Sequence, residues 1–360
     1  MDVGTQGLAS LVVARAFVPR AGWRAWAVIV VAGTIANVDF LSSMGSPGVY
    51  LEWHRTYAHS IIVSLIVSVG LAAWFWFVMR DRLGGDSGRK TPAGMPFVAQ
   101  GKPALPKVQT STPRLAFFAA VIVAGLLHLT MDAAQSNGTM IFWPMSRQRV
   151  ALDWLPRVDP WVIAILLAAL LLPELTRLVS DEIGAKSRGG RGRVGAIVGL
   201  VVLVLYAGLR ADLHSNAVAA LLNRGYDTGQ PHRAAAYADA GSPFIWHGIV
   251  ETERALYEPD VSTFTSSPSD IDNGLTLFKP EPSAMLAQAQ NSEAARKFLA
   301  VARFPKADVE KTGDGYEIEI RDLSYAVAGE RREILARVDL DANGKTLDDE
   351  LVWARDVRQR

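Results

Sequence analysis

Three of the six histidines stand near carboxylates at spacings that suit metal binding. His128 and Asp132 are four residues apart, so in a helix both side chains face the same way. His54 and His59 are five apart, which places His54 at the end of a loop and His59 in the first turn of the next helix. Asp39 closes a preceding apolar segment. These nitrogen and oxygen donors predict a site for a divalent metal, with zinc the best match.

A bound divalent metal would activate water for hydrolysis near neutral pH. Asp132 is expected to act as a ligand or as the general base, and Asp39 is open to the same two roles. Arg55 offers a fixed charge for an anionic substrate group such as a phosphate. The alternative is structural: a histidine at a helix end is often an interfacial polar residue, and His128 with Asp132 also suits a hydrogen-bonded helix pair.

Composition sets the frame for these residues. The 360 residues are 50% hydrophobic and 20% charged, with a net charge of +1, and no cysteine is present. The balanced charge excludes a broadly basic nucleic-acid binder, so no nucleic-acid partner is expected. The absence of cysteine excludes disulfides, thiol catalysis and cysteine zinc sites. A mean hydropathy of +0.16 is high for a soluble protein with this much charge.

The apolar residues gather in the first part of the chain, residues 1–209, which predicts an α-helical multi-pass membrane domain. A helix of about 20 residues spans the hydrocarbon core. Four segments meet or approach this length: Ser60–Met79, Leu115–Met131, Pro160–Val179 and Val194–Leu209. Two weaker segments, Leu8–Val18 and Trp26–Phe40, bring the expectation to about six helices. A five-helix arrangement with the N-terminus inside is the alternative.

Basic residues in the connecting segments predict the orientation. Thirteen lie in the turn near residue 20 and in the 80–114 and 180–193 loops, against four in the opposite loops. By the positive-inside rule the richer side is cytoplasmic. All five candidate ligands then meet at the outer face of the membrane, and this shared placement favours a metal over the structural alternative.

Residues 210–360 read as a small α+β domain with C-terminal antiparallel hairpins, placed outside the cytoplasm by the same rule. Apolar and charged residues alternate over Tyr316–Tyr325 and Glu333–Leu340, as in strands with one wet face. Asn343-Gly344 favours a tight hairpin before a further strand at Thr346–Trp353. Ser292–Val301 predicts a helix with Ser292 as N-cap. The remaining histidines, at 214, 232 and 247, have no partner at metal spacing and are expected to be ordinary surface or core residues.

Several motifs, in order, resemble one known family. They are Glu52-Trp-His54-Arg55-Thr-Tyr-Ala-His59-Ser60, Leu127-His128-Leu-Thr-Met-Asp132, Asn137-Gly138-Thr139, Phe142-Trp143-Pro144, Ala151-Leu-Asp153-Trp154, Val158-Asp159-Pro160-Trp161 and Pro243-Phe-Ile-Trp246. They are similar to the membrane-bound metal-dependent hydrolases, YdjM-like inner-membrane proteins with similarity to zinc-dependent phospholipase C. The resemblance covers about residues 1–180 and implies six helices with both termini outside.

Two positions depart from the family pattern. A family Thr-His pair appears as Thr5-Gln6, and a Pro-Asp-x-Asp motif appears as Ala36-Asn37-Val38-Asp39. Amide oxygens are neutral and bind zinc more weakly, so a two-metal site would be reduced to one ion or be silent.

Three functions compete at this point. The first is a hydrolase in which metal-activated water attacks an ester or phosphoester at the outer membrane interface, with membrane lipids as partners and a lipid head group as a candidate substrate. The second is a catalytically degenerate anchor or scaffold that presents the outer domain to a partner, which Gln6 and Asn37 motivate. The third, a small transporter, is disfavoured because the candidate ligands cluster at one surface, with Glu174 the main exception.

Overall fold

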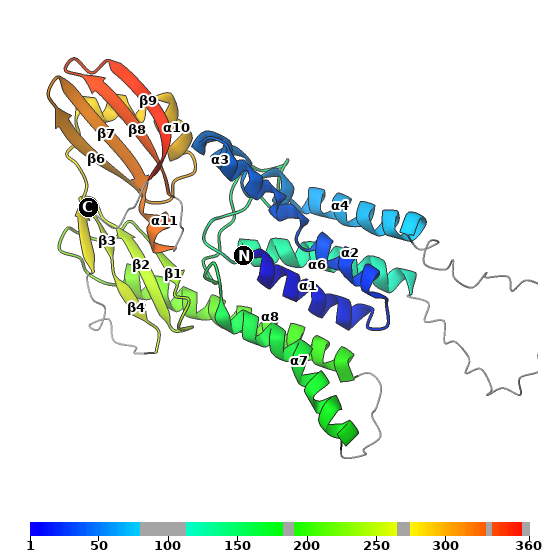
Figure 1. Cartoon of the computed structure of the whole chain (residues 1–360). Coiled ribbons are helices and arrows are strands. Elements are labelled where there is room, and N and C mark those ends of the chain that lie inside the picture. Colours follow the sequence, from blue (N-terminus) through cyan, green and yellow to red (C-terminus); the bar gives the residue numbers. More distant parts are fainter. Residues whose placement is uncertain (80–112, 183–190, 265–273, 329–332, 355–360) are drawn as a thin grey trace, which may run out of the picture.

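The computed structural model describes residues 1–79, 113–182, 191–264, 274–328 and 333–354. A helical bundle lies at one end of the molecule and two β-sheets lie at the other (Figure 1). Residues 80–112 and 183–190, which make up most of the two predicted basic loops, lie outside the described residues.

The bundle is built from helices that bury small and branched apolar side chains against one another. It comprises α1 (Val3–Phe17), α2 (Trp23–Ala32), α4 (Ile61–Trp74) with the short π-helix η3 (Phe75–Met79), α6 (Arg114–Ala133), α7 (Pro160–Glu182) and α8 (Arg191–Leu222). Four described stretches are long and apolar enough to cross a membrane: Ile61–Val78, Arg114–Ala133, Pro160–Val179 and Gly192–Leu222.

Six membrane-crossing helices are not confirmed. A fifth span exists if α2 and the 3₁₀ helix η1 (Ile35–Met44) count as one, but the two are bent by 52°. The weak first segment does form a helix, α1, and its 15 residues reach only about 22 Å. Its buried side chains, such as Val12 and Val13, pack into both apolar cores of the bundle, and it contacts α2, α6, α7 and α8. The helix is therefore central to the packing although its sequence signal is weak.

Short elements cap the bundle on the side of the sheets. They are η1, α3 (Pro47–Trp53) and η2 (Tyr57–His59), followed by an irregular segment between α6 and α7. Ser46 accepts a hydrogen bond from Val49 N to begin α3, and Ser60 accepts one from Val63 N to begin α4. These two serine caps fix where α3 and α4 begin. The cap at Ser60 thereby sets the position of His59, the residue before it.

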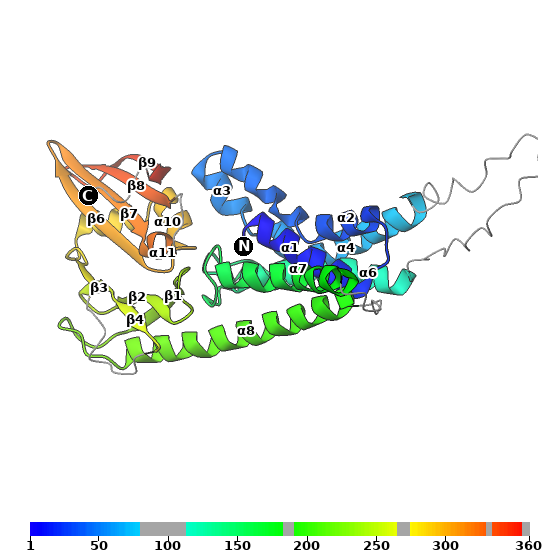
Figure 2. The same cartoon turned by 60° about the horizontal axis from the view of Figure 1, so that its bottom comes forward.

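Helix α8 joins the bundle to the sheets without interruption. It runs beneath both (Figure 2), and the predicted domain boundary at 209/210 lies inside it. At its far end Ala217 and Leu221 are buried in the core of the first sheet. Residues 210–222, which the sequence predicted to belong to the second domain, are thus the last part of α8.

The first sheet is antiparallel, with strand order β1-β2-β3-β5 and β4 paired to β2. Its strands are β1 (Arg233–Ala238), β2 (Ile245–Glu251), β3 (Ala255–Glu258), β4 (Asp260–Ser262) and β5 (Leu275–Phe278).

The second sheet confirms the hairpins predicted from the alternating pattern. Strands β6 (Pro305–Thr312), β7 (Gly315–Asp322), β8 (Glu333–Asp341) and β9 (Thr346–Ala354) pair in that order, all antiparallel. Gly344 takes the positive φ of 84° that the turn before β9 requires. Helices α9 (Ala284–Gln290) and α10 (Glu293–Leu299) cover one face, and Ser292 caps α10 as expected; α11 (Leu323–Val327) follows β7.

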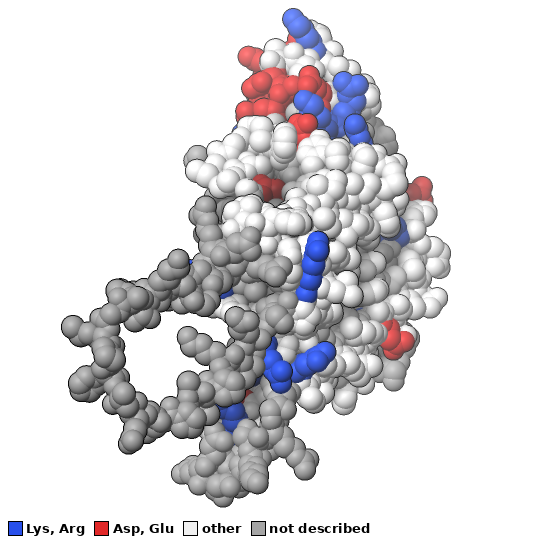
Figure 3. Space-filling model, turned by 90° about the vertical axis from the view of Figure 1, so that its right-hand side faces the viewer, with Lys and Arg blue, Asp and Glu red and all other residues white. Residues whose placement is uncertain are grey.

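Most described side chains of the bundle are uncharged in Figure 3, which views it from the end away from the sheets, whereas acidic and basic side chains gather at the top of the view. Exposed apolar side chains along α4, α7 and α8, including Ile66, Leu171 and Val204, explain this surface. A surface of this kind suits contact with lipid.

Candidate metal centre

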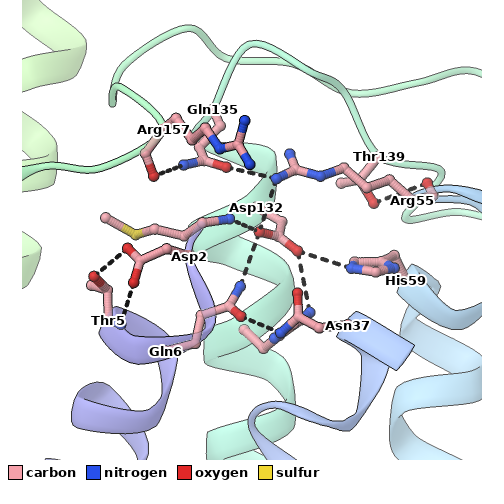
Figure 4. Close-up of polar contacts among 12 residues, drawn as sticks. Asp2, Thr5, Gln6, Asn37, Arg55, His59, Asp132, Gln135, Thr139 and Arg157 are labelled. Carbon is pink, nitrogen blue, oxygen red and sulfur yellow. Dashed lines mark hydrogen bonds and ion pairs between the residues drawn. The ribbon is translucent and has the colours of Figure 1, made fainter. Parts of the chain in front are cut away.

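Three of the predicted ligands converge in the part of the chain that the structure describes. His59 Nε2 lies 3.0 Å and His128 Nε2 lies 3.2 Å from the same oxygen, Asp132 Oδ2. The three residues are 1%, 2% and 0% exposed. They form a group with the donor types and proximity that a metal ion needs. His128 and Asp132 come from the last turns of α6, and His59 comes from η2, so the tertiary fold brings together distant parts of the sequence (Figure 4).

The second nitrogen of each imidazole faces a fixed acceptor. His128 Nδ1 is 2.9 Å from the backbone oxygen of Gly33, which ends α2. His59 Nδ1 is 3.1 Å from Asp39 Oδ2. The acceptor at His128 Nδ1 favours the tautomer that leaves Nε2 free to bind a metal, whereas His59 Nδ1 lies at ion-pair distance from Asp39 and makes no hydrogen bond among the described residues. Both rings are therefore oriented with Nε2 toward Asp132.

The contacts between the three residues fit an ion better than hydrogen bonds. Asp132 Oδ2 and His128 Nε2 are buried, and neither has a hydrogen-bond partner among the described residues. Ligands of a tetrahedral zinc ion lie about 3.4 Å apart when the bonds are about 2.1 Å long. The observed spacings of 3.0 and 3.2 Å are close to this value. A cation between these atoms would satisfy polar groups that are otherwise costly to bury.

The other oxygen of Asp132 faces hydrogen-bond donors. Gln6 Nε2 donates to Asp132 Oδ1 at 3.0 Å, and Asn37 Nδ2 donates to Gln6 Oε1 at 2.5 Å. The amino group of Met1 donates to the same Oδ1, and Arg55 Nη2 is 3.7 Å from it. Figure 4 shows Asp132 at the centre of these contacts. The carboxylate is thus divided, with Oδ2 toward the imidazoles and Oδ1 toward donors.

Asp39 and His54, the other two predicted ligands, form an adjoining layer. Asp39 Oδ2 accepts a hydrogen bond from the backbone N–H of Arg55 at 2.6 Å. His54 Nδ1 is 3.7 Å from Asp39 Oδ1, and the His54 ring stacks on Tyr50 with centroids 4.4 Å apart. Of the three converging residues, Asp39 therefore contacts only His59. His54 is linked to them only through Asp39.

The pKa values of His54 and His59 shift in opposite directions. Burial lowers the pKa of His54, and its more distant contact with Asp39 does not compensate. Burial also opposes a positive charge on His59, but the carboxylates of Asp132 and Asp39 outweigh it and raise the pKa of His59. The carboxylates of Asp132 and Asp39 therefore favour a positive charge at the position of His59.

Arg55 sits at the edge of the centre in a backbone conformation with φ of 55°. Its Nη2 donates to Gln135 Oε1 at 2.9 Å, and Nη1 has no hydrogen-bond partner in the described part of the chain. Gln135 and the backbone oxygen of Gly33 were not predicted. Gln135 lies three residues after Asp132, so helical spacing offered a signal, whereas nothing in the sequence identifies a backbone oxygen as a partner.

Comparison with known proteins identifies a family for the helical part of the chain. No curated protein and no solved structure gives a significant match. The family model of the YdjM inner membrane protein matches residues 1–216, which include the three converging residues and the bundle helices up to the last turns of α8. Together with its apolar helices, this match makes the chain a multi-pass inner-membrane protein. The chain belongs to the YdjM inner membrane protein family.

Proposed function

We propose that this chain is a metal-dependent hydrolase that cleaves an ester or phosphoester at the outer surface of the inner membrane. One observation carries the proposal: His59 Nε2, His128 Nε2 and Asp132 Oδ2 meet in a buried group, and neither His128 Nε2 nor Asp132 Oδ2 has a hydrogen-bond partner among the described residues. Two nitrogen donors and one oxygen donor favour zinc over magnesium or calcium. A bound zinc ion would lower the pKa of a water ligand and supply hydroxide near neutral pH.

The surrounding residues have separate tasks in this proposal. His59, His128 and Asp132 hold the ion, while Asp39 and the Gly33 backbone orient the two rings. Arg55 Nη1 is free of protein hydrogen bonds among the described residues and lies beside Asp132, so it can bind the anionic oxygen of a phosphoester. These groups bind and orient the substrate next to the attacking water.

An apolar rim supports a lipid substrate. Helix η1 directs Asp39 toward the centre, but Phe40 is 56% and Met44 is 84% exposed on the same short helix. Phe142 and Met145, in the segment after α6, are exposed as well. Exposed apolar side chains around a polar site suit the boundary between head groups and acyl chains. A lipid head group at this depth would present its ester or phosphoester bond to the site.

The test is the metal content of full-length protein purified in detergent. We expect about one zinc per chain in the wild type and a large loss in His59→Ala and His128→Ala. His247→Ala, a histidine of the first sheet, is the matched control and should retain its metal. No bound transition metal in the wild type, or equal content in all variants, would contradict the proposal. Loss of phosphodiester hydrolysis in vesicles by Arg55→Gln, with metal retained, would then separate substrate binding from metal binding.

A scaffold without catalysis is the second candidate, and the hydrogen bonds of Gln6 favour it. Gln6 occupies Asp132 Oδ1 and is itself bonded by Asn37, so one side of the carboxylate is closed. If this function is correct, the wild type binds no metal, and the double change Gln6→His with Asn37→Asp creates binding. Hydrolysis by the wild type that His128→Ala abolishes would exclude it.

The orientation of the outer domain is part of the same proposal. The distribution of basic loop residues supports an extracytoplasmic position for residues 223–360. Because the chain has no cysteine, a single introduced cysteine reports on one site without background. In intact spheroplasts, Thr312→Cys should react with an impermeant maleimide, whereas Arg20→Cys should react only after permeabilisation. The reverse pattern would overturn this orientation.

A further inference from the structure

Arg303, in the outer domain between α10 and β6, makes a two-pronged contact with the segment that covers the metal centre. Its Nη1 and Nη2 donate to Asp153 Oδ1 and Oδ2, each at 2.7 Å. Nη1 also donates to the backbone oxygen of Ser136 at 3.3 Å. Asp153 is buried and held at a φ of 59°. Paired bonds between a guanidinium and a carboxylate fix direction as well as distance.

Ser136 and Asp153 belong to two arms of this segment, and the arms are joined to each other. Leu152 N donates to Ala133 O at 2.9 Å, and Leu155 N donates to Ala134 O at 3.0 Å. The side chain of Gln135 donates from Nε2 to the backbone oxygens of Pro156 and Arg157 at 3.0 and 2.9 Å. Arg303 therefore holds both arms at the point where they leave the end of α6.

The joined arms lead directly to the metal centre. Ala133 follows Asp132 in the sequence, and Gln135 N donates to the backbone oxygen of Asp132 at 3.2 Å. The same Gln135 accepts from Arg55 Nη2 through Oε1, and that nitrogen lies 3.7 Å from Asp132 Oδ1. Arg303 is thus connected to Asp132 and Arg55 by a continuous series of hydrogen bonds and adjacent residues in the chain.

We propose that Arg303 is a positioning residue of the metal centre, so that the outer domain completes the site in the bundle. This inference rests on the proposed metal-dependent function. Arg303 touches neither ligand nor substrate; it holds the end of α6 and Gln135 in the geometry that sets Asp132 and Arg55. The outer domain thereby has a part in ion and anion binding beyond presenting a surface to a partner.

The test uses full-length protein in detergent and two measurements. Zinc affinity is measured by competition with a chelator, and amide hydrogen exchange is followed at Gln135, Leu152 and Leu155. Arg303→Ala should lower zinc affinity about tenfold, the lower end of the effect of removing an orienting partner, and should speed exchange at these amides. Arg303→Lys should fall between, because it keeps the charge and loses the paired bonds.

Two further variants exclude a general loss of folding. Arg337→Ala removes an arginine of the same domain that bonds Glu319 on the neighbouring strand, and it should change neither measurement. The exchanged pair Arg303→Asp with Asp153→Arg should restore part of the affinity that Arg303→Ala loses. A folded Arg303→Ala protein with unchanged zinc affinity would overturn the proposal, and so would an equal loss in Arg337→Ala. If the wild type binds no zinc, the proposed function fails, and the exchange at Gln135 alone decides whether Arg303 positions this segment.

Discussion

Among the described residues, one histidine lies between two aspartates in two places, and the two places differ in their surroundings. In the bundle, His59 lies between Asp39 and Asp132, at 3.1 and 3.0 Å. In the first sheet, His247 lies between Asp260 and Asp239, at 2.7 and 3.3 Å. Distances alone do not tell them apart.

Burial and hydrogen bonding separate the two arrangements. Both nitrogens of His247 make hydrogen bonds to their carboxylates, and its side chain is 37% exposed. His59 is buried beside a second imidazole, His128, and Asp132 Oδ2 between them has no hydrogen-bond partner among the described residues. The surface carboxylates are paired as they stand, whereas the buried arrangement leaves Asp132 Oδ2 without a hydrogen-bond partner among the described residues, and a cation would satisfy it. The comparison shows why only the bundle cluster is proposed as a metal centre.

The largest effect should follow removal of the shared carboxylate. Asp132→Asn keeps the size of the side chain but replaces the charged oxygen with a weaker donor, so zinc affinity should fall by more than about a hundredfold, beyond the loss from changing an orienting partner. Asp260→Asn, the equivalent change in the first sheet, should leave affinity unchanged. Chelator competition on both purified variants measures the difference. Equal affinities would erase the distinction between the two arrangements.

A smaller loss is expected from Asp39→Asn, because Asp39 orients His59 from the side opposite Asp132. The amide can still accept a hydrogen bond, but it does not support the imidazole with a charge. Zinc affinity should fall about 10- to 100-fold, with the number of bound ions per chain unchanged at saturating zinc. A change in that number would instead make Asp39 a direct ligand.

Local spacing was enough to predict part of this centre. His128 and Asp132 share a helix face because they are four residues apart, and the helical repeat requires nothing else. His59 joins them only through the packing of α4 against α6, which its own segment does not encode. Residue types and spacing therefore predicted the donors, and the helix directions inferred from the basic loops predicted that they meet at one face of the membrane. Gln6 and Arg55 lie at Asp132 Oδ1 while the imidazoles lie at Oδ2, and this difference between the two oxygens could be seen only in the structure.

The fold shows the same limit. Alternation over Tyr316–Tyr325 and Glu333–Leu340 predicted β7 and β8 because each strand has one apolar face against α9 and α10. The continuity of α8 was missed, since the apolar run ends near Leu209 while the helix continues to Leu222. There its buried face changes partner, from bundle helices to the first sheet. A hydropathy pattern indicates which residues face lipid. It does not indicate that a helix continues when its buried face passes from other helices to a sheet.

Glu333 offers a further comparison with Asp132, because both carboxylates are buried but, among the described residues, no imidazole lies beside Glu333. Burial, with Asp322 and Glu319 nearby, raises its pKa to about 7. The folded state then binds a proton that the unfolded state has lost, so the free energy of unfolding should fall as pH rises from about 4.5 to 7 and level off above. Glu333→Gln should remove this slope and stabilise the protein at pH 8 by about 1 kcal/mol, allowing for solvent screening. Urea unfolding in detergent at several pH values measures it; an unchanged slope would show that Glu333 is ionised throughout.

His247→Ala should have the smallest effect and therefore tests the surface half of the comparison most directly. Its two ion pairs are partly exposed, and such pairs contribute about 0.5 kcal/mol or less. Asp239 keeps its hydrogen bonds from the backbone N–H groups of Gly241 and Ser242, so the loop before β2 should stay in place without the imidazole. Urea unfolding of the full chain in detergent, in the presence of zinc, measures the change. A loss of several kcal/mol, or a loss of bound zinc, would mean that the sheet histidine has a binding role of its own and that burial is not what separates the two arrangements.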